Sequence, residues 1–235
     1  MTAKELGITM IAHRGHSGIY PMNTELSFKK AAENSSQGAE TDIRMTKDGI
    51  FVCSHDAEAV MKDGTELIVS ESTFEELTAQ PLRNLKTDDD VYLCTFRRYL
   101  EIMKENGMIC FVELKGAFTD EQIVEVFETV KEVYDLKKCL MQSFDFDNLI
   151  KIHGLFPELE VMLTYGSREK NFERCFDYGF SIDVDINVAT PEMVKEFHDR
   201  NLEVAVWTCN TQETFERGKT LGADYIESDY FGGND

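Results

Sequence analysis

The sequence predicts an α/β fold of the TIM type: a closed (β/α)8 barrel with an additional hairpin strand and a short insertion at one end. Short apolar runs alternate with amphipathic segments along the chain, which implies a mostly parallel sheet with right-handed crossovers. The length of 235 residues is close to the usual size of one barrel. Because 42% of the residues are hydrophobic, the chain can form a large core. We therefore expect residues 1–235 to form a single domain.

The expected strands are nine short apolar runs: Ile8–Ala12, Ala39–Arg44, Ile50–Ser54, Ile109–Leu114, Cys139–Ser143, Glu160–Leu163, Ser181–Ile186, Glu203–Trp207 and Tyr225–Ser228. A closed TIM barrel needs eight. Asp48-Gly49 at the centre of a two-residue turn is a strong hairpin signal. The third run should therefore lie antiparallel beside the second, outside the ring, unless one of the weaker runs is a loop instead.

Helix ends are marked between these strands. Thr119 with Gln122 forms a capping box ahead of an apolar pattern with helical spacing. Thr190 precedes Pro191, which suits the first position of a helix. Gly222 is suited to a helix C-terminus. These signals support helical crossovers between parallel strands.

Residues 56–94 interrupt the alternation of strands and helices. They contain a possible short helix, capped by Ser72 with Glu75, and the acidic run Asp88-Asp89-Asp90. The segment is too short to be an independent domain. We expect a small insertion over the barrel end.

The composition restricts the partners. A formal net charge of −20 argues against nucleic acid and against stable association with an anionic membrane surface. It does not exclude a small phosphate ester, because one bound cation and a few basic groups can invert the potential inside a cleft. No apolar run approaches the ~18 residues of a membrane-spanning helix. Residues 1–6 lack the features of a secretory signal, so a cytoplasmic location is expected.

The six cysteines are scattered, at positions 53, 94, 110, 139, 175 and 209. No pair has the close spacing of a zinc or redox motif. We expect them to be reduced and to serve as small apolar core residues.

Polar residues interrupt strands at three places: His13-Arg14, Glu40-Thr41-Asp42 and His55. Strand periodicity puts Glu40 and Asp42 on one face. If residues 47 and 50 pair across the turn, Asp42 lies opposite His55. Two close carboxylates repel, so one holds a proton unless a cation lies between them. Carboxylate ligands favour Mg²⁺ or Ca²⁺. The alternative is a solvent-exposed polar face.

Glu113 and Lys115 share one face of the apolar strand Ile109–Leu114 and its end. Catalytic groups of TIM barrels come from the C-terminal ends of several strands. Glu113 can thus complete a metal site, and Lys115 can reach a phosphate oxygen. The alternative is an ordinary ion pair at the barrel end.

In combination, these residues resemble the glycerophosphodiester phosphodiesterase family. His13-Arg14, Glu40-x-Asp42 and His55 match its HR…ExD…H signature in order and spacing. The likeness continues along nearly the whole chain through four further segments: Glu113-Leu114-Lys115, Gln142-Ser143-Phe144, Val206-Trp207-Thr208-x-Asn210 and the closing run 222–230. Any one match is weak, but all of them in the correct order are hard to obtain by chance.

The resemblance implies metal-dependent hydrolysis of small glycerophosphodiesters to glycerol phosphate and an alcohol. Glu40, Asp42 and Glu113 would bind one divalent cation, Mg²⁺ or Ca²⁺. Arg14 and Lys115, with that cation, would offset charge on the phosphorus in the transition state.

The resemblance further implies that His13 and His55 exchange protons with the reacting groups, His13 as base and His55 as acid. The nucleophile is either a neighbouring glycerol hydroxyl or water. Trp207 would stack on the glycerol or on the head group, although a lone aromatic residue on a strand can equally be core. His153 and His198 lie in helical segments and are set aside.

One residue departs from the family pattern. Met22 stands in Pro21-Met22-Asn23-Thr24 where the family has Pro-Glu-Asn-Thr. The family's glutamate is implied to support the site without binding the metal. Its absence bears on the positioning of His13 and on the substrate range.

Three other functions are open. A phospholipase-type phosphodiesterase on a lipid head group would need an apolar rim, whereas segment 56–94 is acidic and short. A catalytically inactive barrel acting as a binding module would not need the His, Glu, Asp and Lys set. A phosphosugar isomerase or lyase would need a glycine-rich loop after the seventh or eighth strand, and none is evident.

Overall fold

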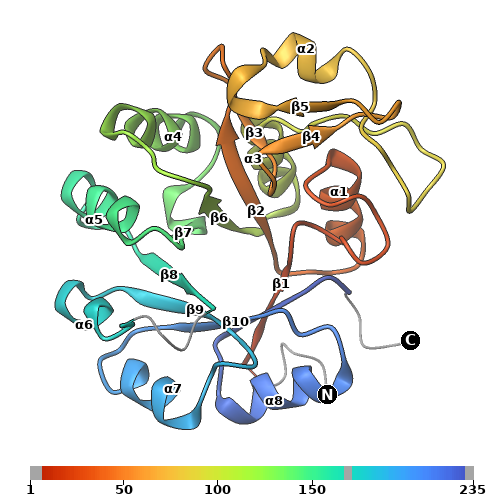
Figure 1. Cartoon of the computed structure of the whole chain (residues 1–235). Helices are drawn as coiled ribbons and strands as arrows, with labels where there is room; N and C mark the ends of the chain where they lie inside the picture. The colour runs from red at the N-terminus through yellow and green to blue at the C-terminus, as the bar shows by residue number, and fades with distance from the viewer. Residues whose placement is uncertain (1–6, 167–170, 231–235) are drawn as a thin grey trace.

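Eight parallel strands form a closed ring in the computed structural model, which describes residues 7–166 and 171–230 (Figure 1). The ring strands are β1 (Thr9–Ala12), β2 (Gly38–Met45), β6 (Ile109–Leu114), β7 (Cys139–Ser143), β8 (Val161–Tyr165), β9 (Ser181–Asp185), β10 (Val204–Trp207) and β11 (Tyr225–Ser228). Their order is β1-β11-β10-β9-β8-β7-β6-β2, and β1 pairs with β2 to close the ring. The predicted TIM-type barrel is confirmed.

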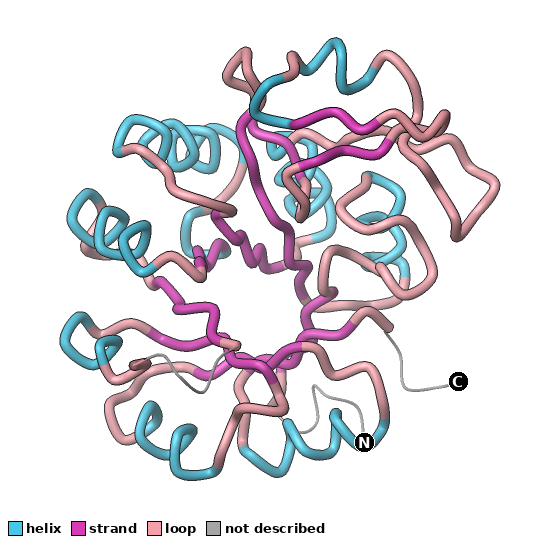
Figure 2. The backbone as a smooth tube through the Cα atoms, viewed as in Figure 1, coloured by secondary structure: helices cyan, strands magenta, loops and turns pink. Residues whose placement is uncertain are grey.

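Helices surround the ring (Figure 2). They are α1 (Glu25–Glu33), α3 (Phe96–Asn106), α4 (Asp120–Val133), α5 (Phe146–Leu155), α6 (Arg174–Tyr178), α7 (Pro191–His198) and α8 (Gln212–Leu221), with the 3-10 turn η3 (Leu136–Lys138) before β7. The capping box of Thr119 and Gln122 begins α4, as predicted. Thr190 caps α7 ahead of Pro191, and left-handed Gly222 ends α8, also as predicted.

The core has two parts. The larger lies between the strands and the helices that cover them. The smaller fills the barrel interior with one side chain from each of five strands, namely Ile11, Phe111, Leu140, Met162 and Ala205. All six cysteines are buried and free of disulfides, as expected.

The hairpin strand β3 (Phe51–Cys53) runs antiparallel to β2 outside the ring, as predicted. The predicted register is wrong by one residue. Ile43 pairs with Cys53, so Asp42 lies opposite Ser54 and not opposite His55. The reason is the turn: the Thr46 amide donates to the Ile50 carbonyl, which leaves a three-residue loop that ends at left-handed Gly49.

The insertion contains β4 (Glu58–Val60), β5 (Glu66–Ile68), the 3-10 turn η2 (Val69–Glu71) and α2 (Phe74–Thr78). In the view of Figure 1 it lies beside the ring, next to β3, and not across it. The short helix is capped by Thr73 with Glu76, so the predicted cap at Ser72 and Glu75 is one residue too early. A small separate core joins the insertion to β3: Val52, Ala59, Met61, Val69, Leu77 and Leu93.

None of the helices in the described ranges is long and apolar enough to cross a membrane. The expectation that the N-terminus lacks a secretory signal concerns residues 1–6, which lie outside the described residues.

Candidate active site

The interior of the barrel changes from apolar to polar toward the C-terminal ends of the strands. Phe111 and Leu140 belong to the inner core, whereas Glu113 and Gln142, two residues further along the same strands, face a pocket. In-register pairing sets Asp42 beside Glu113 and Glu113 beside Gln142. The pocket is lined by His13, Arg14, Glu40, His55, Glu113, Lys115, Gln142, Phe144, Thr164, Asp183, Trp207 and Glu227.

All eight side chains singled out from the sequence meet here. Seven line the pocket directly. The eighth, Asp42, is buried beside it and lies close to Glu40 and Glu113. They come from the interior of β2, from the ends of β6 and β10, and from the segments that follow β1 and β3.

Three buried carboxylates form the centre of the site. One oxygen each of Glu40, Asp42 and Glu113 lies within 4.8 Å of the other two, so the group could hold a metal ion. Burial, and then the neighbouring Asp42, raise the pKa of Glu40 well above its usual value. Burial raises the pKa of Glu113 to about 7 against the opposing effect of Lys115. Such shifts are expected where like charges are held together without a cation between them.

Two basic side chains and one amide partly balance these carboxylates. Lys115 Nζ lies 3.0 Å from Asp42 Oδ1 and 2.7 Å from Glu113 Oε1, and Arg14 Nε lies 3.3 Å from Asp42 Oδ2. Asn23 Nδ2 donates to Asp42 Oδ2 at 2.8 Å. Burial alone would raise the pKa of Asp42, but Lys115, Arg14 and Asn23 outweigh it, and the pKa is lowered. Asp42 therefore stays ionised.

The loop after β1 delivers both His13 and Arg14. Arg14 and Gly15 adopt left-handed conformations, with φ of 56° and 76°. Glycine is required at position 15 for two reasons. Its φ is positive, and a Cβ there would come within 2.5 Å of Ser27 Oγ. The turn directs the Arg14 amide to Glu40 Oε2 at 2.9 Å, which ties the loop to β2.

His13 is held by the carboxylate of Asp229, which follows β11, the strand paired with β1. Its Nδ1 lies 2.7 Å from Asp229 Oδ1. A carboxylate with a depressed pKa only accepts, so Nδ1 carries the proton and Nε2 is left for the pocket. Asp229 also accepts from Ser17 Oγ at 2.8 Å and from Asn210 Nδ2 at 2.6 Å. These contacts outweigh burial and lower the pKa of Asp229 to about 2.

His55 reaches the pocket by a different route from the one predicted. It follows the end of β3, and Arg44 holds the His55 carbonyl through Nη2 at 2.8 Å and Nε at 3.2 Å. The chain thereby leaves the strand and turns the imidazole toward the carboxylates. Its Nδ1 lies 2.8 Å from Asp56 Oδ1. Burial lowers the pKa of His55 although Asp42 opposes this.

The aromatic side of the pocket contains Trp207 and Phe144, whose rings meet edge to face at 5.9 Å. Trp207 Nε1 donates to the Asp183 carbonyl at 3.2 Å. Lys115 Nζ lies 5.4 Å from the centre of the Phe144 ring. Trp207 is thus a fixed wall of the pocket and not a residue of the barrel core.

Several residues of the site were not assigned roles from the sequence, among them Asn23, Asp229, Asp183 and Glu227. Asn23 and Asp229 stand in segments that match the family, and their positions there were the available signal. Asp183 and Glu227 are buried on the inner faces of β9 and β11. Their signal was a carboxylate inside an otherwise apolar strand, which reads in isolation as an ordinary surface position.

Met22, the residue that departs from the family pattern, lies at the edge of the site. It is 40% exposed, and Arg14 Nη1 donates to its sulfur at 3.5 Å. A weak sulfur acceptor therefore stands beside a guanidinium that also contacts Asp42.

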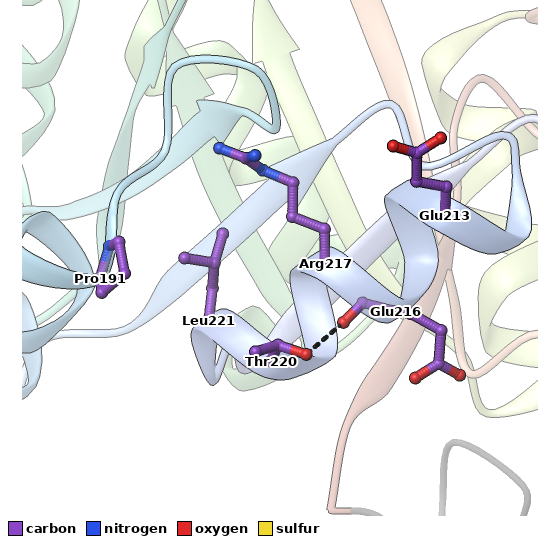
Figure 3. Close-up of a pocket in the computed structure, with 6 residues that line it drawn as sticks. All are labelled: Pro191, Glu213, Glu216, Arg217, Thr220 and Leu221. Carbon is purple, nitrogen blue, oxygen red and sulfur yellow. Dashed lines mark hydrogen bonds between the residues drawn. The ribbon is translucent and has the colours of Figure 1, made fainter.

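A second depression lies on the outer surface beside α8 (Figure 3). Arg217 on its floor donates to the carbonyls of Ile186 and Ala189 at 3.0 Å, so its guanidinium already serves the fold. Because the guanidinium of Arg217 is engaged in this way, this depression is a poor candidate for binding a phosphate ester.

A model of the glycerophosphoryl diester phosphodiesterase family matches residues 13–232. The chain belongs to this family. It is 24% identical to a glycerophosphodiester phosphodiesterase of Bacillus altitudinis, with 94% of each chain covered. It is 26% identical to one of Caldanaerobacter subterraneus subsp. tengcongensis, covering 94% of this chain and 93% of that one.

Solved structures show the same fold. An Oleispira antarctica phosphodiesterase in complex with the product sn-glycerol-3-phosphate superimposes with a TM-score of 0.86 at 22% identity, covering 98% of this chain and 96% of that one. A glycerophosphodiester phosphodiesterase of Thermotoga maritima gives a TM-score of 0.76 at 25% identity, with 94% of each chain covered. The resemblance found in the sequence is thus confirmed.

Proposed function

We propose that this protein hydrolyses small glycerophosphodiesters to glycerol phosphate and an alcohol, with the help of one divalent cation. The observation that carries the proposal is the meeting of two histidines, two basic side chains and three buried carboxylates in one pocket. The reaction breaks the bond between phosphorus and the alcohol oxygen. It forms a new bond from phosphorus to water, or first to a neighbouring glycerol hydroxyl.

Glu40, Asp42 and Glu113 would hold the cation. The group fits, because Arg14 and Lys115 are the cationic side chains bonded to these three buried carboxylates within the described residues, which leaves one negative charge without a partner if all are ionised. The oxygen donors favour Mg²⁺ or Ca²⁺. A bound cation would act as a Lewis acid that draws charge from a phosphate oxygen.

Arg14 and Lys115 would bind the phosphate. Lys115 now spans Asp42 and Glu113, so its ammonium is already fixed at the mouth of the pocket. Asp42 and Glu113 raise the pKa of Lys115 against the effect of burial, so the group stays charged. Donors fixed in a pocket that excludes water stabilise developing charge more strongly than donors in water do.

His13 and His55 would transfer the protons. Asp229 fixes the ring of His13 so that Nε2 faces the pocket, the arrangement of a general base that is oriented by a carboxylate. His55, on the other side of the carboxylate cluster, would protonate the leaving alcohol. Trp207 would form the wall against which the glycerol or the head group packs.

The same site argues for small substrates. The lining is dominated by charged and polar groups, and a lipid aggregate would require an apolar rim. With a net charge of −20, we propose a cytoplasmic protein that acts as one domain without nucleic acid or stable membrane partners.

A product assay on glycerophosphocholine, glycerophosphoethanolamine and glycerophosphoinositol tests the proposal. We expect glycerol phosphate to be released in Mg²⁺ or Ca²⁺, with loss of activity in excess EDTA and recovery when either cation is added back. Turnover of micellar phospholipid but not of these soluble diesters would favour the phospholipase alternative. No turnover of either class would favour a binding module.

A further inference from the structure

Glu227 is a buried carboxylate that the proposed reaction does not use. It is 1% exposed on β11, it faces the pocket, and its Oε1 has no hydrogen-bond partner among the described residues. The charged groups that act on it most strongly are other carboxylates, Asp183 and Glu40 first. An acidic oxygen in these surroundings needs either a proton or a cation.

Two neighbours of Glu227 provide further donor atoms. One ligand atom each of His13, Glu40 and Glu227 lies within 4.8 Å of the other two. This is a second group beside Glu40, Asp42 and Glu113, and the two groups share Glu40. A carboxylate has two oxygens, so Glu40 can serve both groups at once.

The state of His13 supports a role as a metal ligand. Metal-binding histidines almost always donate their other ring N–H to a carboxylate or carbonyl. His13 does so through Nδ1, which lies 2.7 Å from Asp229 Oδ1. Ser17 and Asn210 in turn bind Asp229, so the imidazole is held from behind while Nε2 is left for the pocket.

The two groups differ in their donor chemistry. Glu40, Asp42 and Glu113 offer only carboxylate oxygens, which suit Mg²⁺ or Ca²⁺. His13, Glu40 and Glu227 offer one imidazole nitrogen and two carboxylates, a set that suits zinc and other first-row transition metals. Moreover, no lysine or arginine is bonded to Glu227 in the described chain, whereas Lys115 is bonded to both Asp42 and Glu113.

We propose that His13, Glu40 and Glu227 form a second cation site that prefers a transition-metal ion such as Zn²⁺ and is separate from the Mg²⁺ or Ca²⁺ site. A cation on Nε2 takes the lone pair that His13 needs as a base. Zn²⁺ should therefore inhibit hydrolysis even when Mg²⁺ is saturating. This inhibition rests on the proposed function, but the binding of Zn²⁺ does not.

Calorimetric titration of ZnCl₂ into the Mg²⁺-saturated protein tests the site. We expect one Zn²⁺ to bind, and we expect its affinity to stay the same when more Mg²⁺ is added. Glu227→Gln, which keeps the shape of the side chain, should weaken Zn²⁺ binding by at least about tenfold and leave Mg²⁺ binding close to that of the wild type. Glu196→Gln, an exposed change on α7, is the matched control and should alter neither.

A spectroscopic measurement on the wild type tests the site without relying on the folding of a variant. With ¹⁵N-labelled histidine, Zn²⁺ should shift the Nε2 resonance of His13 and leave that of His198, on the outer surface, in place. An unmoved His13 resonance, or Zn²⁺ and Mg²⁺ that simply displace each other, overturns the second site. If the protein hydrolyses the diesters in Mg²⁺ but binds no Zn²⁺, the second site is wrong and the proposed function stands. If Zn²⁺ binds at His13 but no diester is hydrolysed, the proposed function is wrong and the second site stands.

Discussion

The two sides of the barrel mouth handle buried negative charge in different ways. On the β2–β6 side, Asp42 and Glu113 are bonded to Lys115, and Asp42 also contacts Arg14 and Asn23. On the β9–β11 side, Asp183 and Glu227 are as deeply buried, yet one oxygen of each has no hydrogen-bond partner within the described residues. The pKa of Asp42 is accordingly lowered and burial raises that of Glu113 only to about 7, whereas burial raises that of Asp183 well above its usual value.

This difference suggests a division of roles. Asp42, which its basic and amide partners keep ionised, can exchange Lys115 for a cation and release its ammonium toward a phosphate. Uncompensated carboxylates are costly in the metal-free fold, because an unpaired charge in a nonpolar interior is strongly disfavoured. Such a cost is retained at functional sites, where a ligand can relieve it.

The largest expected effect is on the two histidines that line the pocket. His13→Ala or His55→Ala should lower kcat by about 10²–10⁴-fold, the usual range for general acid–base catalysis. A nitrophenyl ester, whose leaving group needs no proton, should rescue His55→Ala but not His13→Ala. Steady-state kinetics on both substrates would show this, with His198→Ala as the nearly silent control.

The opposite pattern of rescue would exchange the roles of the two histidines. Rescue of neither variant would show that proton transfer to the leaving group is not what His55 does.

A smaller but still large loss of activity is expected when Lys115, the lysine of the β2–β6 side, is replaced. Lys115→Met should lower kcat/KM by about 10²–10³-fold, since it removes one donor to the developing phosphate charge. Asp183→Asn, on the β9–β11 side, should cost clearly less, because within the described residues no hydrogen bond or ion pair joins the Asp183 carboxylate to a histidine, lysine or arginine assigned to the reaction. Equal losses in the two variants, measured on one diester, would remove the functional contrast between the sides.

The contrast also predicts an effect on stability in the metal-free protein. Glu227→Gln or Asp183→Asn should raise the free energy of unfolding at pH 7 by about 1–3 kcal/mol, because each replaces a buried carboxyl, which must either take up a proton or carry an unpaired charge, with a neutral amide. The pKa values of both carboxyls are raised in the fold, so the folded wild type binds more protons than the unfolded chain and loses stability as pH rises above about 4.

The gain should therefore shrink as pH falls toward 4, where the wild-type carboxyls are protonated in both states. Urea unfolding in EDTA at several pH values measures it, and Glu196→Gln should show no change. Variants that are no more stable than the wild type at pH 8 would mean that the β9–β11 carboxyls are already satisfied.

The smallest effect is expected at the edge of the site. Met22→Glu restores the carboxylate of the family pattern next to Arg14. Because Met22 is 40% exposed, the new ion pair should be worth less than about 1 kcal/mol, or at most about fivefold in kcat/KM. A larger gain in kcat/KM would show that Met22 limits the positioning of Arg14.

Some parts of this structure follow from local sequence and others do not. The barrel, most strand positions and the helix caps follow from alternating apolar runs and short-range capping residues. The register of the hairpin does not, because Asp48-Gly49 fits a two-residue turn and a three-residue loop equally well. The outcome depends on Thr46, whose amide donates to Ile50 and whose hydroxyl accepts from the Ile50 amide.

The site shows the same division. The β2–β6 side was predictable because its residues stand in a recognisable order along the chain. His55 lies in the pocket as predicted, but the predicted cause, pairing opposite Asp42, is wrong. The turn that Arg44 holds through the His55 carbonyl brings it there. Glu227 and Asp183 could not be assigned, because their position inside the pocket is a property of the closed ring and not of neighbouring residues in the sequence.

Anomalous diffraction from crystals soaked in Mn²⁺ tests most directly whether the β2–β6 side is a cation site. We predict a peak between Glu40, Asp42 and Glu113, within about 2.6 Å of their oxygens, with Lys115 displaced from at least one carboxylate. A map that shows no peak there, at a Mn²⁺ concentration that supports full turnover and with Lys115 still bound to Asp42 and Glu113, would contradict it.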